Sequence, residues 1–296
     1  MTRIPLGCRL VLVAGLSGAL AAAVPAHGDE AAGKAVYVRH CAECHGDSGR
    51  GDGPKSKKLG FHPRDFTFGA FKCRCTPSGQ APSDADLERT IRRGLAGTPM
   101  QAYDKKLSDD EIRQVIPYLR TLAPGRAAAT PPPCLSIPEP PAQGTLVTEG
   151  AHVYRILQCA MCHGTSGRAD GPSAAALKDD WGLVSKPQTF IGMTKFKCGK
   201  DDRDLFRTIH TGMSGSPMPS YAAAFRYVRE NASSLDGVQG LHGAAGARET
   251  SEYLSKEPDR ASFDALPEAK KEEIVERRTW ALVQYIRSLG QALAKP

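Results

Sequence analysis

Two five-residue stretches, each with two cysteines and a histidine, constrain this chain more than any other feature. They are Cys41-Ala42-Glu43-Cys44-His45 and Cys159-Ala160-Met161-Cys162-His163. On a helix the second cysteine lies three positions after the first and the histidine four, so the three side chains share one face. With 9 Cys and 8 His in 296 residues, random placement would produce about 0.007 such matches. Chance therefore does not account for two of them.

Two thiols beside an imidazole suit the covalent attachment of haem c. The cysteines can form thioethers with two vinyl groups, and the histidine is then held beneath the iron as its proximal ligand. A thioredoxin-like redox pair does not call for the trailing histidine. Paired Cys-x-x-Cys zinc modules normally separate their halves by far less than the 118 residues between Cys41 and Cys159. We therefore predict two covalently attached haem c groups (iron), bound by Cys41, Cys44, His45, Cys159, Cys162 and His163.

Residues 1–28 have the pattern of a secretory signal peptide. Arg3 and Arg9 give a positive start, residues 10–24 are apolar, and small residues around Ala26 offer a cleavage site. An uncleaved membrane anchor is the alternative, but a run of about 15 apolar residues is short for a span. We predict an exported, periplasmic protein with no membrane span in the mature chain.

The distribution of charge argues against nucleic acid as a partner. The chain has 39 basic and 32 acidic residues, a formal net charge of +7. The basic residues are interspersed with acidic ones and have no aromatic-rich binding motif, so we expect no nucleic-acid binding. The length that remains after cleavage suggests two ordinary domains.

An internal repeat supports two domains. At a shift of 118 residues, Asp52-Gly53-Pro54 falls on Asp170-Gly171-Pro172, and Pro99-Met100 falls on Pro217-Met218. The register slips only in the middle, where Phe71-Lys72-Cys73 aligns with Phe196-Lys197-Cys198 at a shift of 125. We interpret the slip as a local insertion that is compensated before the next element.

Each copy is predicted to be helical. The periodicity and capping signals place a first helix near Gly33 and Gly150, a middle helix over 84–94 and 202–212, and a last helix over 108–122 and from Pro267 to about Leu293. We divide the chain into a signal peptide (1–28), a first unit (29–123), a linker (124–146) and a second unit (147–296).

The linker and one insertion lie outside the repeat. The linker contains Pro131-Pro132-Pro133 and is predicted to be an extended, semi-rigid spacer. The second unit has an insertion at about 222–269, whose glycine-rich part, Gly237–Gly246, we expect to be a flexible surface loop. Docking of a partner is an alternative role for this loop.

Both units resemble class I cytochrome c domains. The resemblance rests on the first helix with its glycine and aromatic residue, the Cys-x-x-Cys-His motif, the glycine-rich loop, the methionine loop and the last helix. It implies an all-α fold of two tandem domains, each wrapped around one covalent haem c. It also implies that the first and last helices cross at Gly33/Tyr118 and at Gly150/Tyr285.

Met100 and Met218 are the predicted sixth ligands of the irons. Each lies 55 residues after the histidine of its motif, in a Gly-Thr-Pro-Met or Gly-Ser-Pro-Met loop that is similar to the family's distal-ligand loop. The other methionines, Met161, Met193 and Met213, are interpreted as structural. For the second nitrogen of the proximal histidine, Pro54, Pro172 or nearby backbone carbonyls are candidate acceptors, with turn formation as the alternative role of these prolines.

Four further cysteines remain in the mature chain: Cys73, Cys75, Cys134 and Cys198. An even number in an oxidising compartment suggests two disulfides, with three connectivities to choose from. Cys73 and Cys198 occupy equivalent repeat positions, which favours their pairing and leaves Cys75 for Cys134. A cysteine thiolate as an iron ligand, as in dihaem thiosulfate dehydrogenases, is the rival interpretation.

His/Met ligation leaves no open position on iron, so the predicted function is outer-sphere electron transfer rather than catalysis. The expected partners are a protein electron donor and a protein acceptor, with a membrane respiratory complex as one candidate. The alternative is a dihaem enzyme such as a peroxidase or a thiosulfate dehydrogenase. A gas or redox sensor is a third interpretation, but no signalling domain is attached.

Overall fold

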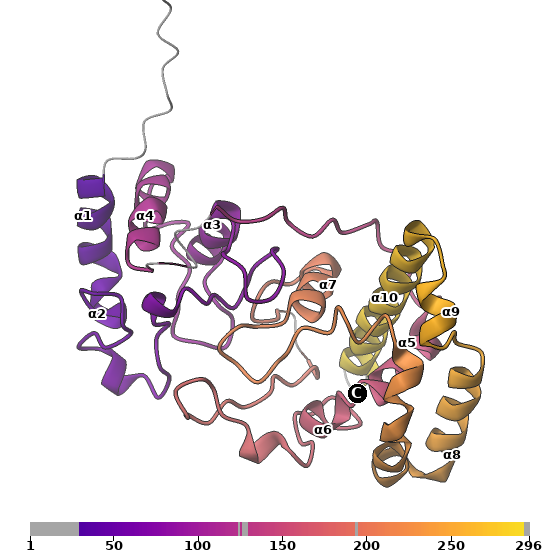
Figure 1. Ribbon diagram of the computed structural model, residues 1–296. Coiled ribbons are helices and arrows are strands. Elements are labelled where there is room, and N and C mark those ends of the chain that lie inside the picture. Colours follow the sequence, from indigo (N-terminus) through magenta and orange to yellow (C-terminus); the bar gives the residue numbers. More distant parts are fainter. Residues whose placement is uncertain (1–29, 124, 126–129, 193–194, 293–296) are drawn as a thin grey trace, which may run out of the picture.

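The computed structural model describes residues 30–123, 125, 130–192 and 195–292. The predicted signal peptide, residues 1–28, lies outside this part of the chain. The described residues form helices joined by long loops, with two isolated β-bridges and no β-strand. No helix within the described ranges is long and apolar enough to cross a membrane. Figure 1 shows the two units side by side, joined across one edge by the extended linker.

The helices follow the predicted repeat. The four helices of the first unit are α1 (Glu30–His40), α2 (Ala42–His45), α3 (Asp84–Arg93) and α4 (Asp109–Thr121). Their counterparts in the second unit are α5 (Val147–Ile156), α6 (Ala160–His163), α7 (Asp202–Thr211) and α10 (Glu268–Ala292). The middle helices agree with the prediction to within a residue. The first helices begin three residues before the predicted glycines.

Capping side chains set where the helices begin. Ser83 starts α3 and Ser108 starts α4, each with a full capping box. Asp201 and Asp204 form the same arrangement at the start of α7. A capping box satisfies two backbone N–H groups that the first turn would otherwise leave unpaired.

In each unit the first and last helices cross at a glycine, as the resemblance implied. Gly33 lies against the carbonyl of Gln114 and the side chain of Tyr118, and a Cβ there would clash with that carbonyl. Gly150 lies in the same way against Ala281 and Tyr285. Only a residue without a side chain lets the two backbones approach so closely.

A buried tyrosine packs beside each crossing and ties the helix pair to the motif. Tyr37 lies 5.2 Å from Tyr118 between ring centroids, and Tyr154 lies 5.2 Å from Tyr285. The Tyr37 hydroxyl donates to the carbonyl of Gly46 at 2.6 Å, directly after the first motif. Tyr154 makes the same bond to Gly164 at 2.6 Å. The helix pair therefore fixes the position of each Cys-x-x-Cys-His segment.

The insertion in the second unit is helical, so the expectation of a flexible loop over Gly237–Gly246 is wrong. This segment lies within α8 (Leu235–Ser255), which has one non-helical residue, Gly243, and α9 (Arg260–Asp264) follows. Val238, Leu254 and Phe263 are buried in the core of the second unit. Burial of an apolar face offsets the low helix propensity of the glycines.

The two disulfides match the pairing that the repeat favoured. Cys73 joins Cys198 with a Cα–Cα distance of 5.3 Å and links the two units, and Cys75 joins Cys134 at 4.8 Å. The backbone N–H of Leu135 also donates to the carbonyl of Cys75 at 2.8 Å. The described part of the linker is therefore attached to the first unit by a covalent bond and a hydrogen bond.

The linker is also attached to the second unit. Arg203 donates to the carbonyl of Ile137 at 2.7 Å and to Glu139 at 2.8 Å. Gln284 on α10 donates to the carbonyl of Ala142 at 2.9 Å and accepts from the N–H of Leu146 at 2.9 Å. A spacer held at both ends fixes the relative position of the units more firmly than its proline content alone would.

The helix crossing predicts a destabilising effect of one methyl group. We expect Gly150→Ala to lower the free energy of unfolding by about 1–3 kcal/mol, because the added Cβ forces α5 away from α10. The matched control is Gly240→Ala on α8, where a Cβ would meet open space and a gain of about 0.5–1 kcal/mol is expected. Urea unfolding followed by circular dichroism measures both. Equal effects of the two substitutions would contradict the crossing.

Candidate haem-binding sites

The first motif begins directly after α1, the second is separated from α5 by two residues, and each contains one short helix. In the first unit the backbone N–H of His45 donates to the carbonyl of Cys41 at 2.9 Å. In the second unit His163 makes the same bond to Cys159 at 2.9 Å. Because this is the helical spacing of four residues, the first cysteine and the histidine of each motif lie one above the other.

The four motif cysteines form no disulfide, whereas the other described cysteines are paired. Cys41, Cys44 and Cys162 are partly buried, and Cys159 is buried. Burial raises the pKa of the Cys41 thiol and of the Cys159 thiol to about 12. Within each motif the neighbouring thiol adds to the effect. Burial therefore favours the thiol form of these two cysteines over the thiolate before a haem is attached.

The motif histidines present one nitrogen each to a ligand. The Nδ1 of His45 lies 3.0 Å from the carbonyl oxygen of Arg64, and that of His163 lies 3.0 Å from the carbonyl of Gln188. A carbonyl oxygen can only accept, so Nδ1 carries the proton and Nε2 keeps its lone pair. Burial lowers the pKa of both imidazoles, which favours this neutral form.

These acceptors correct the expectation that Pro54 or Pro172 receives the bond. The alternative that a nearby backbone carbonyl accepts is right, but the carbonyls lie farther along the chain, at Arg64 and Gln188. Pro54 and Pro172 keep the turn-forming role. Their neighbours Gly53 and Gly171 pack tightly on the backbone of the motif helix.

A phenylalanine stacks on each motif histidine. Phe66 lies 4.5 Å from His45 between ring centroids with an interplanar angle of 20°. Phe190 lies 4.5 Å from His163 at 21°. Both phenylalanines are buried. Each ring is therefore held by a hydrogen bond on its edge and an aromatic contact on its face, which leaves it one orientation.

A repeated sequence pattern contains both the proximal acceptors, Arg64 and Gln188, and the stacked phenylalanines, Phe66 and Phe190. Pro63-Arg64-Asp65-Phe66 and Pro187-Gln188-Thr189-Phe190 share a Pro-x-x-Phe pattern at a shift of 124 residues. The pattern lies in the stretch where the repeat register slips, so the comparison at a shift of 118 missed it. The same backbone contact follows in both units: Phe66 N–H donates to Gly49 at 2.7 Å, and Phe190 N–H donates to Gly167 at 2.7 Å.

The methionine loops of the two units have the same hydrogen bonds. The carbonyl of Met100 accepts from the N–H of Leu95 at 2.9 Å, and the carbonyl of Met218 accepts from Met213 at 3.0 Å. Inside each loop the hydroxyl of Thr98 or Ser216 donates to the first residue of the turn, at 2.8 and 2.7 Å. Two diverged sequences thus fold into one loop conformation.

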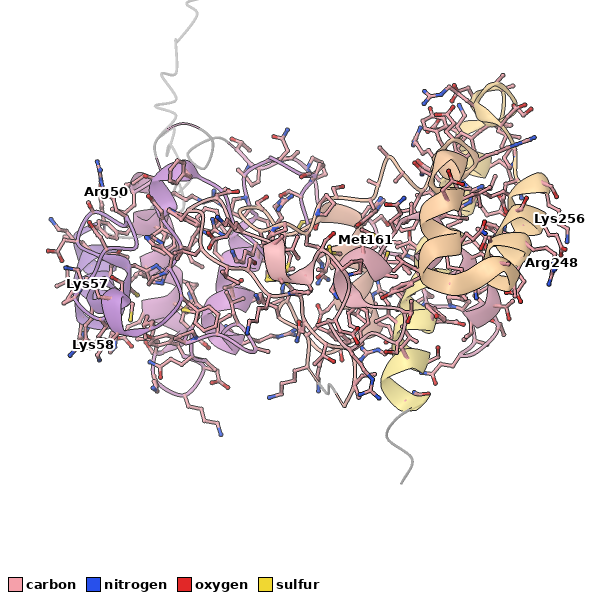
Figure 2. The ribbon with its side chains drawn as sticks, turned by 90° about the horizontal axis from the view of Figure 1, so that it is seen from below. Arg50, Lys57, Lys58, Met161, Arg248 and Lys256 are labelled. Carbon is pink, nitrogen blue, oxygen red and sulfur yellow. A yellow bond between two sulfur atoms is a disulfide. The ribbon has the colours of Figure 1, made fainter. Side chains whose placement is uncertain are left out.

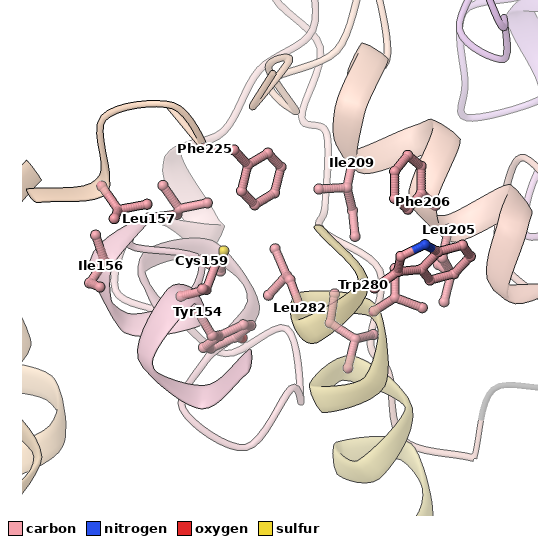
Figure 3. Packing of buried hydrophobic residues seen from close by; sticks show 14 of the residues in the cluster. Tyr154, Ile156, Leu157, Cys159, Leu205, Phe206, Ile209, Phe225, Trp280 and Leu282 are labelled. Atoms are coloured by element: carbon pink, nitrogen blue, oxygen red, sulfur yellow. The ribbon is translucent and has the colours of Figure 1, made fainter. Parts of the chain in front are cut away.

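In the second unit the motif and the methionine belong to one core. Cys159 is buried in a cluster with Tyr154, Phe225 and Leu282, and the partly buried Met218 packs against the same cluster. Figure 3 shows Cys159 among these aromatic and aliphatic side chains. In the first unit Cys41 packs against the corresponding core, and Met100 is partly buried in its loop.

These residues fit haem c. In both units the donor set offers two cysteines outside the disulfides, one imidazole whose Nε2 is left to bind iron, and the methionine of a loop with the same hydrogen bonds. Apolar and aromatic side chains line the surroundings, as a porphyrin requires. The residues predicted from the sequence therefore lie in two equivalent settings.

Comparison with known families gives one match that covers both units. The family described as cytochrome C oxidase, cbb3-type, subunit III matches residues 28–119 and 145–234, which together are more than half of the chain. Both Cys-x-x-Cys-His motifs and both methionines lie inside the matched residues. The helical insertion after residue 234 lies outside them.

Two curated relatives are similar over part of the chain. The cbb3-type cytochrome c oxidase subunit CcoP of Azospirillum brasilense is 31% identical over 97 residues, which are 32% of this chain and 28% of that protein. CcoP of Azospirillum sp. (strain B510) is 32% identical over 105 residues, 33% and 30% of the two chains. The matched region thus spans less than a third of these curated relatives.

One solved structure is similar over nearly the whole length. It is a chain of the Kuenenia stuttgartiensis reducing HAO-like protein complex Kustc0457/Kustc0458, with a TM-score of 0.67 and 31% sequence identity. The alignment covers 87% of this chain and 95% of that chain. The similarity therefore includes both units and their arrangement.

The stacked rings predict that Phe66 contributes more to stability than another phenylalanine of the same loop. We expect Phe66→Leu to lower the free energy of unfolding by about 1 kcal/mol, because the contacts with His45 and Phe71 are lost. The control is Phe61→Leu, since Phe61 is 54% exposed and its replacement should change stability by less than about 0.5 kcal/mol. Urea unfolding compares them, and an equal loss would argue against the stacking role.

Proposed function

Because this chain belongs to the family of cytochrome c oxidase, cbb3-type, subunit III, we propose that it is a periplasmic electron carrier. The chain is a dihaem c-type cytochrome built from two class I cytochrome c domains, with two covalently attached haem c groups. In the proposal, electrons enter at one haem, cross to the other and leave to a second protein partner.

The proposed attachment sites are the two motifs. Cys41 and Cys44 would form the thioethers of the first haem with His45 as proximal ligand, and Met100 would be its sixth ligand. The corresponding residues of the second haem would be Cys159, Cys162, His163 and Met218. The observation that carries the proposal is the equality of the two sites, which share the hydrogen bond at Nδ1, the stacked phenylalanine and the methionine loop.

The protein's part in electron transfer would be to keep both irons six-coordinate. When bound, haem c supplies reversible one-electron chemistry at iron, and a methionine ligand raises the reduction potential. The carbonyls of Arg64 and Gln188 hold the proximal rings in one tautomer and orientation, and His45 and His163 would present the same nitrogen to iron in either oxidation state. A rigid site of this kind needs little reorganisation when the charge on iron changes.

We further propose that the chain works as a subunit of a larger redox assembly. Its full-length structural relative belongs to a complex with a HAO-like protein, and its curated relatives are subunits of a cytochrome c oxidase. The partner would be a protein that carries its own redox cofactor.

A cysteine-ligated enzyme, the rival interpretation, has less support. That reaction class needs a thiolate beside an iron, as expected for a thiosulfate dehydrogenase. In the described ranges all four cysteines outside the motifs are paired in disulfides. Neither unit therefore offers a further free thiol within the part of the chain that the structure describes.

The proposed ligand set predicts different effects of two methionines in one loop. We expect Met218→Ala to open one iron, so that half of the haem binds carbon monoxide, and to lower the reduction potential of that haem. The matched control is Met213→Ala, because Met213 lies in the same loop but is not a proposed ligand. Visible spectra of the reduced protein with and without carbon monoxide measure the effect.

The outcome that would contradict the ligand assignment is a reversal of the two variants. Carbon monoxide binding by Met213→Ala, with none by Met218→Ala, would move the ligand to Met213. Carbon monoxide binding or peroxide turnover by the unaltered protein would mean that one iron is already open. The enzyme interpretation would then replace electron carriage.

A further inference from the structure

Four cationic side chains meet where the two units join. We call Arg64, Lys72, Arg74 and Lys197 the interdomain cation cluster. Arg74 is 1% exposed, and the other three are partly buried. Lys72 and Lys197 directly precede Cys73 and Cys198, whose disulfide links the units. The cluster therefore lies on both sides of the joint.

The Arg74 side chain bridges the two units through the hydrogen bonds that its guanidinium donates. Its guanidinium donates to the carbonyl of Thr211 and to the hydroxyl of Ser214, both at 2.7 Å across the joint. It also donates to the carbonyls of Phe71 and Pro77, at 3.1 and 3.2 Å. Arg74 thus holds the first unit against the loop that leads to Met218.

Arg64 and Lys72 each have N–H donors that the described residues leave without a hydrogen bond. Arg64 donates through Nη2 to the carbonyl of Ser214 at 3.1 Å and lies over the Trp181 ring at 4.7 Å, but its buried Nη1 has no hydrogen-bond partner within the described residues. The Nζ of Lys72 makes one long contact, 3.4 Å to the carbonyl of Gly215. An ammonium group has three donors, so most of its hydrogen-bonding capacity remains.

The four cations have no carboxylate partner within the part of the chain that the structure describes. Among the described residues no carboxylate lies within ion-pair distance of these four cations. The nearest acidic residues around Arg64 are Asp180, Asp179 and Asp65. Asp65 accepts from Thr67, and Asp179 accepts from the backbone of Trp181 and Leu183. These carboxylates around Arg64 are therefore either engaged locally or, like Asp180, exposed. The carboxylate that acts on Arg74 is Asp86, which is paired with Arg89.

A buried arginine elsewhere in the chain differs from the interdomain cation cluster because it has an anionic partner. Arg278 is fully buried and forms an ion pair with the buried carboxylate of Glu257. Burying a cation without an anion is costly, and proteins normally pair such groups. Burial, together with the nearby charges of Arg64 and Lys197, lowers the pKa of Lys72 to about 7. The interdomain cluster thus has the properties of a site for an anionic group.

The cluster is connected to both motifs by equivalent aromatic chains. In the first unit His45 stacks on Phe66, which stacks on Phe71 at 5.8 Å, and Lys72 follows Phe71 in sequence. In the second unit His163 stacks on Phe190, and Phe196 lies 6.2 Å from Phe190. Lys197 follows Phe196 in sequence. Each lysine therefore follows the last ring of an aromatic chain that begins at the proximal histidine of its own unit.

We propose that the propionate carboxylates of the two haems are bound by the interdomain cation cluster, with Lys72 serving the first haem, Lys197 the second and Arg64 lying between them. Each haem c brings two carboxylates, and charge-assisted hydrogen bonds to buried cations are the strong ones. The two propionate edges then face one another across the Cys73–Cys198 joint. The inference rests on the two haems and not on the electron-carrier role.

Exposed lysines provide matched controls. Figure 2 shows Arg50, Lys57 and Lys58 at one end of the molecule, and Arg248 and Lys256 at the other, away from the joint. Lys58 is exposed in the first unit, and Lys195 is exposed two residues before Lys197 in the second. Replacing either Lys58 or Lys195 removes one positive charge and leaves the four residues of the interdomain cation cluster unchanged.

The test compares Lys72→Gln and Lys197→Gln with Lys58→Gln and Lys195→Gln in the haem-loaded protein. We expect each cluster variant to shift the propionate bending bands in the resonance Raman spectrum. We also expect each to lower the reduction potential of one haem, because a nearby positive charge favours the ferrous state. Lys72→Arg should restore both signals, and the exposed controls should leave them unchanged.

Unchanged propionate bands and potentials in the double variant Lys72→Gln/Lys197→Gln, with both haems attached, would overturn the proposal. If the double variant fails to acquire haem, an experimental structure of the unaltered holoprotein decides. Propionate oxygens within hydrogen-bond distance of the Lys72 and Lys197 ammonium groups would support the site, and propionates directed away from the joint would overturn it. These readouts do not depend on electron transfer, so they remain informative if the proposed function fails.

Discussion

The close crossing of the first and last helices is the constraint on which each unit depends. At Gly33 and Gly150 the absence of a side chain lets two backbones meet. The tyrosine beside each crossing then holds the carbonyl that follows the Cys-x-x-Cys-His motif, at 2.6 Å in both units. The geometry of each site is thus set by packing at a distance from the ligands themselves.

The bonds between the two units are the second constraint on the structure. The Cys73–Cys198 disulfide, the Arg74 bonds to the Met218 loop and the linker bonds to Arg203 and Gln284 fix one arrangement. Arg64 connects the two sites most directly, because its carbonyl orients His45 and its side chain contacts the loop of the other unit. Arg64 therefore takes part both in the first site and in the contact between the units.

The sequence predicted the features that repeat with a strict period. The two motifs and the two methionine loops follow from residue types at equal spacing. The crossing at the glycines was implied by the resemblance to class I cytochrome c domains, and the equivalent repeat positions of Cys73 and Cys198 favoured the disulfide pairing. The proximal acceptors were missed because Arg64 and Gln188 are chemically unrelated and their contribution is a backbone carbonyl. The helices over 235–264 were missed because glycine frequency suggested a loop, whereas burial of Val238, Leu254 and Phe263 determines the structure. The linker between the units was predicted to be extended, but its side-chain anchors depend on residues far apart in sequence.

The central claim is that both haems are low-spin and ligated by histidine and methionine. Electron paramagnetic resonance of the fully oxidised holoprotein at low temperature, with near-infrared magnetic circular dichroism on the same sample, tests it most directly. The account predicts two low-spin ferric signals of equal intensity, both with the charge-transfer band of methionine-ligated haem. A high-spin signal, or a band typical of thiolate or second histidine ligation at either iron, would contradict it.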